Sequence, residues 1–99
     1  MHQNTFRSTK EFDNWLNKLT YRVAKARVFY RIDAASLGNF GECASVGEGV
    51  SEMKIHVGPG YRIYYKRIDT LIYMLLAGGD KSSQKQDIRH AIELARGLT

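Results

Sequence analysis

The sequence predicts a small α+β domain built around a twisted antiparallel sheet. Residues 51–57 and 61–67 each alternate polar and apolar side chains, which is typical of strands with one covered face. Gly58-Pro59-Gly60 lies between them and predicts a tight turn, because glycine tolerates a positive φ and proline fixes its own. Residues 71–77 follow a second turn and are apolar throughout, as in a central strand covered on both faces. These three strands are expected to form an antiparallel meander.

Two helices are predicted before the meander. Ser8 and Glu11 form a capping-box pattern, in which each side chain can bond the backbone of the other, and this pattern marks the first helix start. The apolar residues that follow recur at helical spacing and form one stripe: Phe12, Trp15, Leu16 and Leu19. Because its ring is the largest apolar group in the chain, we expect Trp15 to lie in the core.

The second helix is expected to be capped by Thr20 and to end at Gly38. Its predicted stripe is narrower: Val23, Ala26, Tyr30, Ala34 and Leu37. Almost no linker separates the two helices, so they should fold back as a hairpin on the sheet face that carries Met53, Ile55 and Val57. The basic residues of the second helix are interpreted as a solvated face, with a secondary anion contact as the alternative: Arg22, Lys25, Arg27 and Arg31.

Three shorter segments complete the predicted order. Thr5 and Phe6 could add an edge strand to the sheet. Residues 38–49 are rich in glycine and are expected to form a loop, but no Gly-Lys-Ser/Thr follows, which argues against a nucleotide-binding loop. Asp80 is placed to cap a last helix. Its buried stripe should comprise Ile88, Ala91, Ile92, Ala95 and Leu98.

Composition limits the class of protein. The 99 residues are expected to form one domain over residues 1–99, and 15 basic against 10 acidic residues leave a net charge of +5, which favours acidic partners such as nucleic acid or an acidic protein. The single cysteine, Cys43, excludes an internal disulfide and fits a reducing cytoplasm. No signal-peptide pattern opens the chain, and no apolar run approaches the roughly 20 residues that span a bilayer. We therefore expect a cytoplasmic protein that does not bind membranes.

The alternation of the two strands places a basic and aromatic set on one face of the sheet. Its members are Lys54, His56, Arg62, Tyr64 and Lys66. Such groups can cut RNA without a metal: a base takes the 2′-hydroxyl proton, cations stabilise the charged phosphorane, and an acid protonates the leaving 5′-oxygen. An ordinary solvated face is the alternative interpretation. The histidines and Cys43 are too widely spaced to predict a metal site, and no cofactor is expected.

Several blocks of the sequence resemble one protein family. They are Lys25-Ala-Arg-Val-Phe-Tyr-Arg-Ile-Asp33, Leu37-Gly-Asn-Phe-Gly41, Val46-Gly-Glu-Gly-Val-Ser-Glu-Met-Lys-Ile-His56, Gly58-Pro-Gly-Tyr-Arg-Ile-Tyr-Tyr65 and Leu76-Ala-Gly-Gly-Asp-Lys-Ser-Ser-Gln84 with Asp87-Ile88. Together they resemble the RelE/ParE superfamily of toxins from type II toxin–antitoxin systems, in its HigB-like branch of addiction module killer proteins. The resemblance covers nearly the whole chain.

The resemblance implies a β-α-α-β-β-β-α fold and one of two activities. The first is ribosome-dependent cleavage of mRNA, and the alternative is ParE-like poisoning of DNA gyrase; a toxin-fold binding module without activity is a third possibility. It also implies an antitoxin partner from the same operon, usually a helix-turn-helix protein.

The site residues of the family carry over one at a time. Lys54, Arg62 and Lys81 match basic residues that nuclease members use, whereas ParE-type poisons generally lack this set, so mRNA cleavage is favoured. His56 is added to the catalytic set because histidine can act as acid or base near neutral pH, with a surface polar role as the alternative. Two residues depart from the pattern: Glu52 stands where some nucleases have Lys, and Asp87 lies near a position that some members fill with a catalytic Tyr. The expected RNA-binding residues are Tyr61, Tyr64, Lys66 and Arg67.

Overall fold

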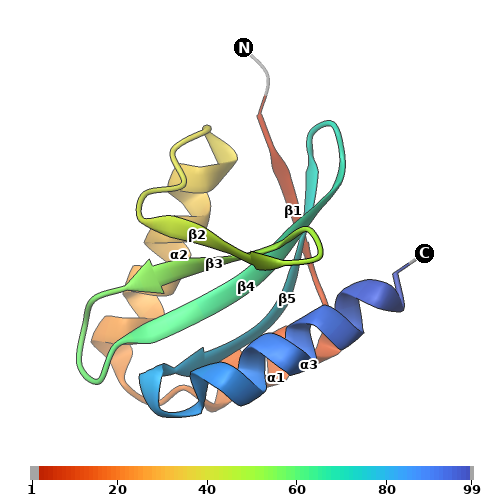
Figure 1. Cartoon of the computed structure of the whole chain (residues 1–99). Helices are drawn as coiled ribbons and strands as arrows, with labels where there is room; N and C mark the ends of the chain where they lie inside the picture. Colours follow the sequence, from red (N-terminus) through yellow and green to blue (C-terminus); the bar gives the residue numbers. More distant parts are fainter. Residues whose placement is uncertain (1–2, 99) are drawn as a thin grey trace.

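The computed structural model describes residues 3–98 and confirms the predicted α+β class. The elements run in the order β1 (Thr5–Ser8), α1 (Lys10–Lys18), α2 (Arg22–Ser36), β2 (Cys43–Gly47), β3 (Val50–Ile55), β4 (Tyr61–Asp69), β5 (Ile72–Asp80), the 3₁₀ helix η1 (Lys81–Ser83) and α3 (Gln84–Arg96). The strands form one twisted sheet in the order β1-β5-β4-β3-β2 (Figure 1). The predicted meander corresponds to β3, β4 and β5, which pair antiparallel.

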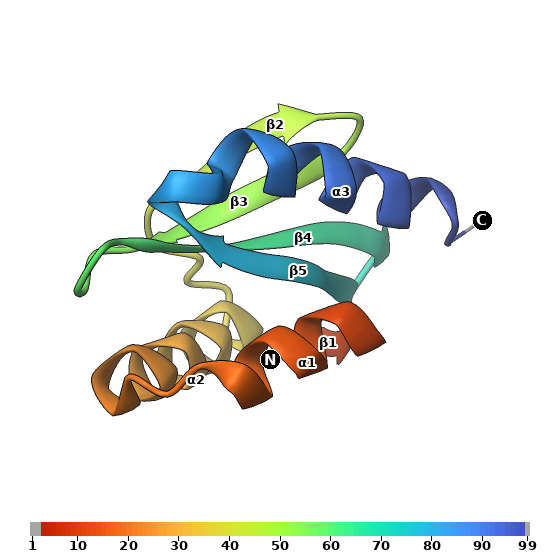
Figure 2. The ribbon, with the colours of Figure 1, turned by 90° about the horizontal axis from the view of Figure 1, so that it is seen from below.

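Helices cover both faces of the sheet. The hairpin of α1 and α2 lies on one face and α3 on the other (Figure 2). On the hairpin side, Met53 and Ile55 are buried against Phe12 and Val28, as the strand alternation predicted. On the other side, α3 buries Ala91 and Ala95 against sheet residues Val50, Tyr64 and Leu76. The face that was expected to be open is therefore largely covered by α3.

The N-terminal segment is an edge strand, as predicted, but the first helix starts one residue later than expected. β1 pairs parallel with β5. Thr9 caps α1, and its hydroxyl oxygen accepts from the Phe12 amide at 3.1 Å. The Thr9 hydroxyl also donates to the carbonyl of Leu76 at 2.6 Å, which ties α1 to β5. Ser8 still belongs to β1, and its hydroxyl donates to the Asp13 carboxylate, so the predicted capping box with Glu11 is wrong.

The predicted buried stripe of the second helix is wrong. Tyr21, and not Thr20, precedes the first turn of α2, and no side chain caps this end among the described residues. The buried residues are Ala24, Val28 and Ala35, whereas most of the predicted stripe faces solvent, with Tyr30 66% exposed. Apolar residues lie on both sides of this helix, so their periodicity alone does not identify the buried side.

Arg31 was interpreted as part of a solvated basic face, and this interpretation is also wrong. Its guanidinium donates to the carbonyl oxygens of Lys54, Phe40 and Glu42. Because it satisfies carbonyls of the segment that leads into β2 and of β3, Arg31 joins the hairpin to that edge of the sheet. Its role is therefore structural.

The segment over residues 38–49 contains a strand where a loop was predicted. Residues Cys43–Gly47 form β2, which pairs antiparallel with β3, and the exposed Cys43 lies at its start. Most side chains of β2 are exposed, so the alternation that marks the other strands is missing. The sheet consequently has one more strand than the implied order contained.

Two glycines near the end of β5 make room for side chains on opposite faces of the sheet. A Cβ on Gly78 would lie 2.3 Å from the Trp15 ring, and one on Gly79 would lie 1.9 Å from a carboxylate oxygen of Asp87. Trp15 is partly buried and packs at the edge of the hairpin-side core rather than in its centre. Asp80 caps η1 by accepting from the Ser82 amide, which turns the chain from β5 toward α3.

Candidate functional site

The predicted catalytic residues gather at one end of the sheet, where the β3–β4 turn meets the end of β5. Strand pairing places Arg62 on β4 directly opposite Lys54 on β3. The backbone N–H of Lys81 donates to the Gly60 carbonyl at 3.0 Å, so the start of η1 is held against the turn. Arg62, Lys81 and His56 line one hollow of about 380 Å³ together with the turn residues. The fold therefore brings these three predicted side chains together at one hollow.

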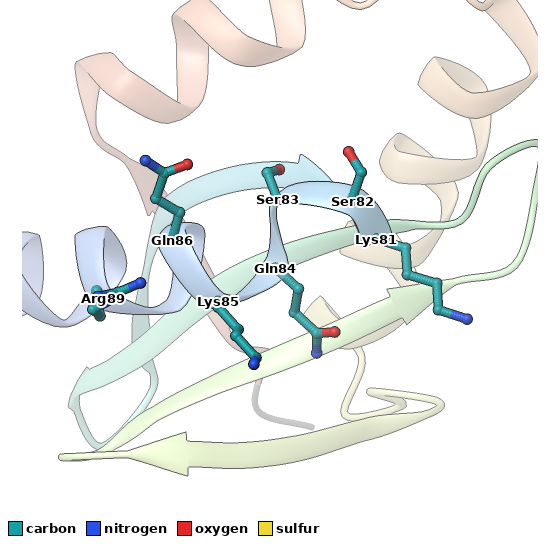
Figure 3. A pocket seen from close by; sticks show the side chains of 7 residues that line it. All are labelled: Lys81, Ser82, Ser83, Gln84, Lys85, Gln86 and Arg89. Atoms are coloured by element: carbon teal, nitrogen blue, oxygen red, sulfur yellow. The ribbon is translucent and has the colours of Figure 1, made fainter.

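A second hollow continues the basic surface along α3. It has a volume of about 430 Å³, and Lys81 lines both hollows. Figure 3 shows Lys81, Gln84 and Lys85 projecting to one side of the helix. Arg89 lines the far end of the same hollow. We name the set Arg62, Lys81, Lys85 and Arg89 the basic strip.

Arg62 is held by a buried carboxylate. Its side chain is 13% exposed, and its Nε lies 3.6 Å from Oε2 of Glu52, whose side chain is 5% exposed. Gln84 at the start of α3 donates to both oxygens of Glu52, at 3.1 and 3.3 Å. Glu52 thus links β3, β4 and α3, and it counters the charge of Arg62 inside the protein. This role explains why a carboxylate is tolerated at position 52, where some nucleases of the resembled family have a lysine.

Lys54 and His56 share a carboxylate at the surface. The Nε2 atom of His56 lies 2.8 Å from Oε1 of Glu42, and Nζ of Lys54 lies 3.9 Å from Oε2 of the same residue. The hydrogen bond with His56, with smaller contributions from the charges of His56, Lys54 and Arg31, lowers the pKa of the Glu42 carboxyl below its ordinary value. Glu42 therefore stays ionised at neutral pH and orients the His56 ring beside the hollow.

The expectation that Tyr64 stacks an RNA base is wrong. Its side chain is fully buried beneath α3, although the alternation assigned it to the correct face. Burial is the main cause that raises the Tyr64 pKa above its ordinary value, and the nearby carboxylates of Glu52 and Asp87 add to the effect. Tyr61 lies on the hairpin side, where its ring packs 6.4 Å from that of Trp15. Neither ring belongs to the basic strip.

The other two predicted RNA-binding residues lie toward the far end of β4. Lys66 pairs in register with Val50 and Met74, and it is partly exposed beside Gly49. The exposed Arg67 lines a separate hollow of about 290 Å³, together with the aromatic rings of Phe40, Tyr65 and Tyr73. Sheet geometry therefore separates both from Arg62 and Lys81.

Sequence reasoning missed Lys85 and Arg89. Together with Lys81 they recur at intervals of four residues, a spacing that places side chains on one face of a helix. This spacing can be read from the sequence, but the last helix was predicted from its apolar residues alone. Between residues 3 and 98, no group of three or more His, Cys, Asp or Glu side chains is placed to hold a metal ion. No helix of that same range has both the length and the apolar character to cross a membrane.

Comparisons with known proteins agree with this architecture. No protein-family model matches the sequence. An uncharacterized protein of Haemophilus influenzae strain KW20 Rd is 45% identical over 92 residues, which cover 93% of each chain. The structure is similar to that of a mutant of the E. coli toxin RelE in its free state, with a TM-score of 0.73, 12% sequence identity and coverage of 98% of this chain and 99% of that one. The predicted RelE-like fold is thereby confirmed.

Proposed function

We propose that this chain, which belongs to the same family as the H. influenzae protein and has the fold of RelE, is the toxin of a type II toxin–antitoxin pair. In this proposal it belongs to the HigB-like branch and inhibits translation by cutting mRNA on the ribosome. An antitoxin from the same operon holds it inactive in the cytoplasm. The fold supports the toxin assignment, and the site supports the choice of RNA as substrate.

The observation that carries the proposal is the convergence of Arg62 and Lys81 on one hollow at the end of the sheet. A phosphate entering this hollow would meet two cations from different elements. Preorganised cations stabilise the charge that builds on the phosphate oxygens during attack, and they need no rearrangement at that moment. Arg62 is suited to grip the phosphate, because its planar guanidinium remains charged and can donate two parallel hydrogen bonds.

The chemistry proposed is a transesterification that needs no external reactant. The 2′-oxygen attacks the adjacent phosphorus, the bond from phosphorus to the 5′-oxygen breaks, and a cyclic phosphate remains on the upstream fragment. Lys54 or His56 takes the 2′-hydroxyl proton, and Lys81 or His56 donates one to the leaving 5′-oxygen. His56 is the residue that fits either role near neutral pH.

The test is expression of the chain and its variants without an antitoxin, followed by primer extension on cellular mRNA. Wild type should arrest growth and cut mRNA. Arg62→Ala and Lys81→Ala should each lower the cleavage rate by about 10²–10³, as the loss of one charge-stabilising donor does in other active sites. Arg7→Ala removes an exposed cation from β1 and serves as the matched control. It should cut like wild type.

Two results would contradict the proposal. Folded Arg62→Ala and Lys81→Ala variants that cut mRNA as fast as wild type would place the active site elsewhere. Growth arrest with double-strand DNA breaks and intact mRNA would instead identify the gyrase-poisoning alternative. Circular dichroism on the purified variants establishes that they are folded.

A further inference from the structure

The hollow that Arg67 lines belongs to neither the basic strip nor the candidate catalytic set. It has a volume of about 290 Å³. Its main lining side chains come from the segment before β2 and from four strands: Phe40, Cys43, Ser51, Tyr65, Arg67 and Tyr73. Arg62 and Arg67 are five residues apart on β4, which corresponds to roughly 16 Å along a strand. We name this hollow the aromatic hollow.

Three rings form the apolar side of the aromatic hollow. Tyr65 is only 6% exposed, and the Phe40 ring stacks on it with the centroids 5.6 Å apart. The Tyr73 ring lies 5.2 Å from Phe40 and 6.1 Å from Tyr65, and it is tilted by 52° and 57° to them. Such a set offers both ring faces and ring edges, which are the contacts that a planar aromatic molecule prefers.

The polar side of the aromatic hollow selects for negative charge. Of the described residues that line it, Arg67 alone is charged. Its Nε donates to the carbonyl of Asp69 at 3.2 Å, which anchors the side chain, and no carboxylate of residues 3–98 forms an ion pair with it. A guanidinium can donate two parallel hydrogen bonds to a carboxylate or a phosphate.

We propose that the aromatic hollow binds a small planar aromatic anion, whose ring packs against Phe40 and Tyr73 and whose carboxylate or phosphate is held by Arg67. Ligand sites typically combine apolar and aromatic walls with a few placed polar groups. A volume of about 290 Å³ is at the small end of such sites, so the ligand should have one or two rings.

A short segment connects the aromatic hollow to the candidate catalytic residues. Phe40 and Cys43 line the hollow, and Glu42 between them lies 2.8 Å from Nε2 of His56. The Arg31 guanidinium donates to the carbonyl oxygens of Phe40 and Glu42. A ligand in contact with Phe40 and Cys43 should therefore change the surroundings of His56. An effect on cleavage rests on the proposed function, whereas binding does not.

Two matched pairs of probes test the proposal by isothermal titration calorimetry on the full chain. Indole-3-carboxylate is compared with indole-3-carboxamide, and adenosine 5′-monophosphate is compared with adenosine. In at least one pair the anion should bind at least about tenfold tighter than its neutral counterpart, because hydrogen bonds between charged groups are the stronger ones. The pair that shows this preference distinguishes an aromatic carboxylate from a mononucleotide as the source of the ligand.

Substitution of Arg67 separates the charged contact from the aromatic one. Arg67→Gln should weaken binding of the anion by about tenfold and leave the neutral probe within about twofold. Arg22→Gln removes an exposed cation from α2 and should leave both probes within about twofold. Both arginines are exposed, so the variants should fold, and circular dichroism checks this.

Cys43 reports occupancy without any substitution. It is the only cysteine of the chain, it is exposed, and it lines the aromatic hollow. Its alkylation by iodoacetamide, followed by mass spectrometry, should slow by about tenfold when the anionic probe is present at about ten times its Kd, because only about a tenth of the sites are then free. The ring signals of His56 in the NMR spectrum should shift under the same conditions.

Four outcomes would overturn the proposal: no binding of any probe, equal binding of the anion and its neutral counterpart in both pairs, equal losses in Arg67→Gln and Arg22→Gln, or unchanged alkylation of Cys43. Unchanged His56 signals in the bound state would overturn the connection to the candidate site. Because binding is measured without RNA, a failure of the proposed function would appear separately, as absent mRNA cleavage with probe binding intact.

Discussion

At the scale of single residues, the pairing of Glu52 with Arg62 is the feature that shapes the candidate site. A cation that is 13% exposed needs a counter-charge, and Glu52 supplies it while Gln84 holds the carboxylate from α3. Arg62 is thus fixed before any substrate arrives, which is the condition for efficient charge stabilisation.

Replacing Glu52 with Gln should therefore destabilise the protein. The substitution keeps the shape and leaves the Arg62 charge buried without its partner, so the free energy of unfolding should fall by about 3–5 kcal/mol. Urea unfolding of Glu52→Gln, Arg62→Met and the double variant measures the coupling. The double variant should lose less stability than the two single variants lose in total. Additive losses would mean that the two side chains do not interact.

Tyr64 gives a second prediction at this scale. Its hydroxyl is buried and has no hydrogen-bond partner among the described residues. Tyr64→Phe removes the unsatisfied group, so stability at neutral pH should stay the same or rise by up to about 1 kcal/mol. Cleavage of mRNA should be unchanged. Loss of cleavage in a folded Tyr64→Phe variant would assign the buried hydroxyl a part in the reaction, which contradicts this account.

The same residue predicts how stability depends on alkaline pH. Burial raises the Tyr64 pKa above its ordinary value of about 10, so the neutral form is favoured in the folded state. This contribution to stability is fully present below about pH 10 and is lost as the pH rises toward the folded-state pKa. Between about pH 9 and pH 11, the free energy of unfolding measured with urea should fall less steeply for Tyr64→Phe than for wild type. The Tyr65 pKa is also raised by burial, so Tyr64→Phe should still lose some stability at alkaline pH.

At the scale of elements, a clear alternation of polar and apolar residues predicted the buried side of a strand correctly. Where the apolar pattern was weak or two-sided, the prediction failed. The alternation in β3 and β4 predicted which residues face the hairpin, and Met53 and Ile55 lie there. β2 was missed because its exposed side chains carry no alternation and its pairing with β3 depends on contacts outside the segment. The buried side of α2 was misassigned because Val23 and Val28 lie on opposite apolar sides of one helix.

The candidate site shows the same limit. Lys54 and Arg62 could be placed together from the strands alone, because residues on adjacent strands across a short turn must meet. Covering of this face by α3 could not be predicted, since strand periodicity identifies two faces and does not say which one a distant helix will occupy. That is why Tyr64 was expected at the surface.

The packing of α1 on β5 gives a prediction for Gly78. An added Cβ would lie 2.3 Å from the Trp15 ring, so Gly78→Ala must displace the ring or the strand, and it should cost about 1–3 kcal/mol of stability. Gly97→Ala is the matched control, because its φ is −76° and a Cβ there makes only ordinary contacts. The control should change stability by less than about 0.5 kcal/mol. Equal effects in thermal or urea unfolding would contradict this account of the packing.

At the scale of the whole molecule, the helical hairpin reaches the candidate site at one point. Tyr21, which precedes α2, approaches the turn beside the hollow of Arg62 and Lys81. A Cβ on Gly58 would lie 2.8 Å from the Tyr21 ring. The residue at the start of α2 therefore packs against the turn that forms one wall of the candidate site.

The basic strip predicts how the whole molecule should bind single-stranded RNA. Its four cations come from β4, η1 and α3, and each phosphate contact releases condensed counterions, so the logarithm of the binding constant should fall with the logarithm of salt concentration with a slope of about −3. A 2′-O-methyl oligoribonucleotide prevents cleavage and allows the slope to be measured by fluorescence anisotropy. Lys85→Ala should reduce its magnitude by about 0.7, whereas Arg7→Ala should leave it unchanged. Equal changes of the slope in the two variants would mean that RNA binding depends only on the net charge of the protein. In that case the RNA does not lie along the basic strip.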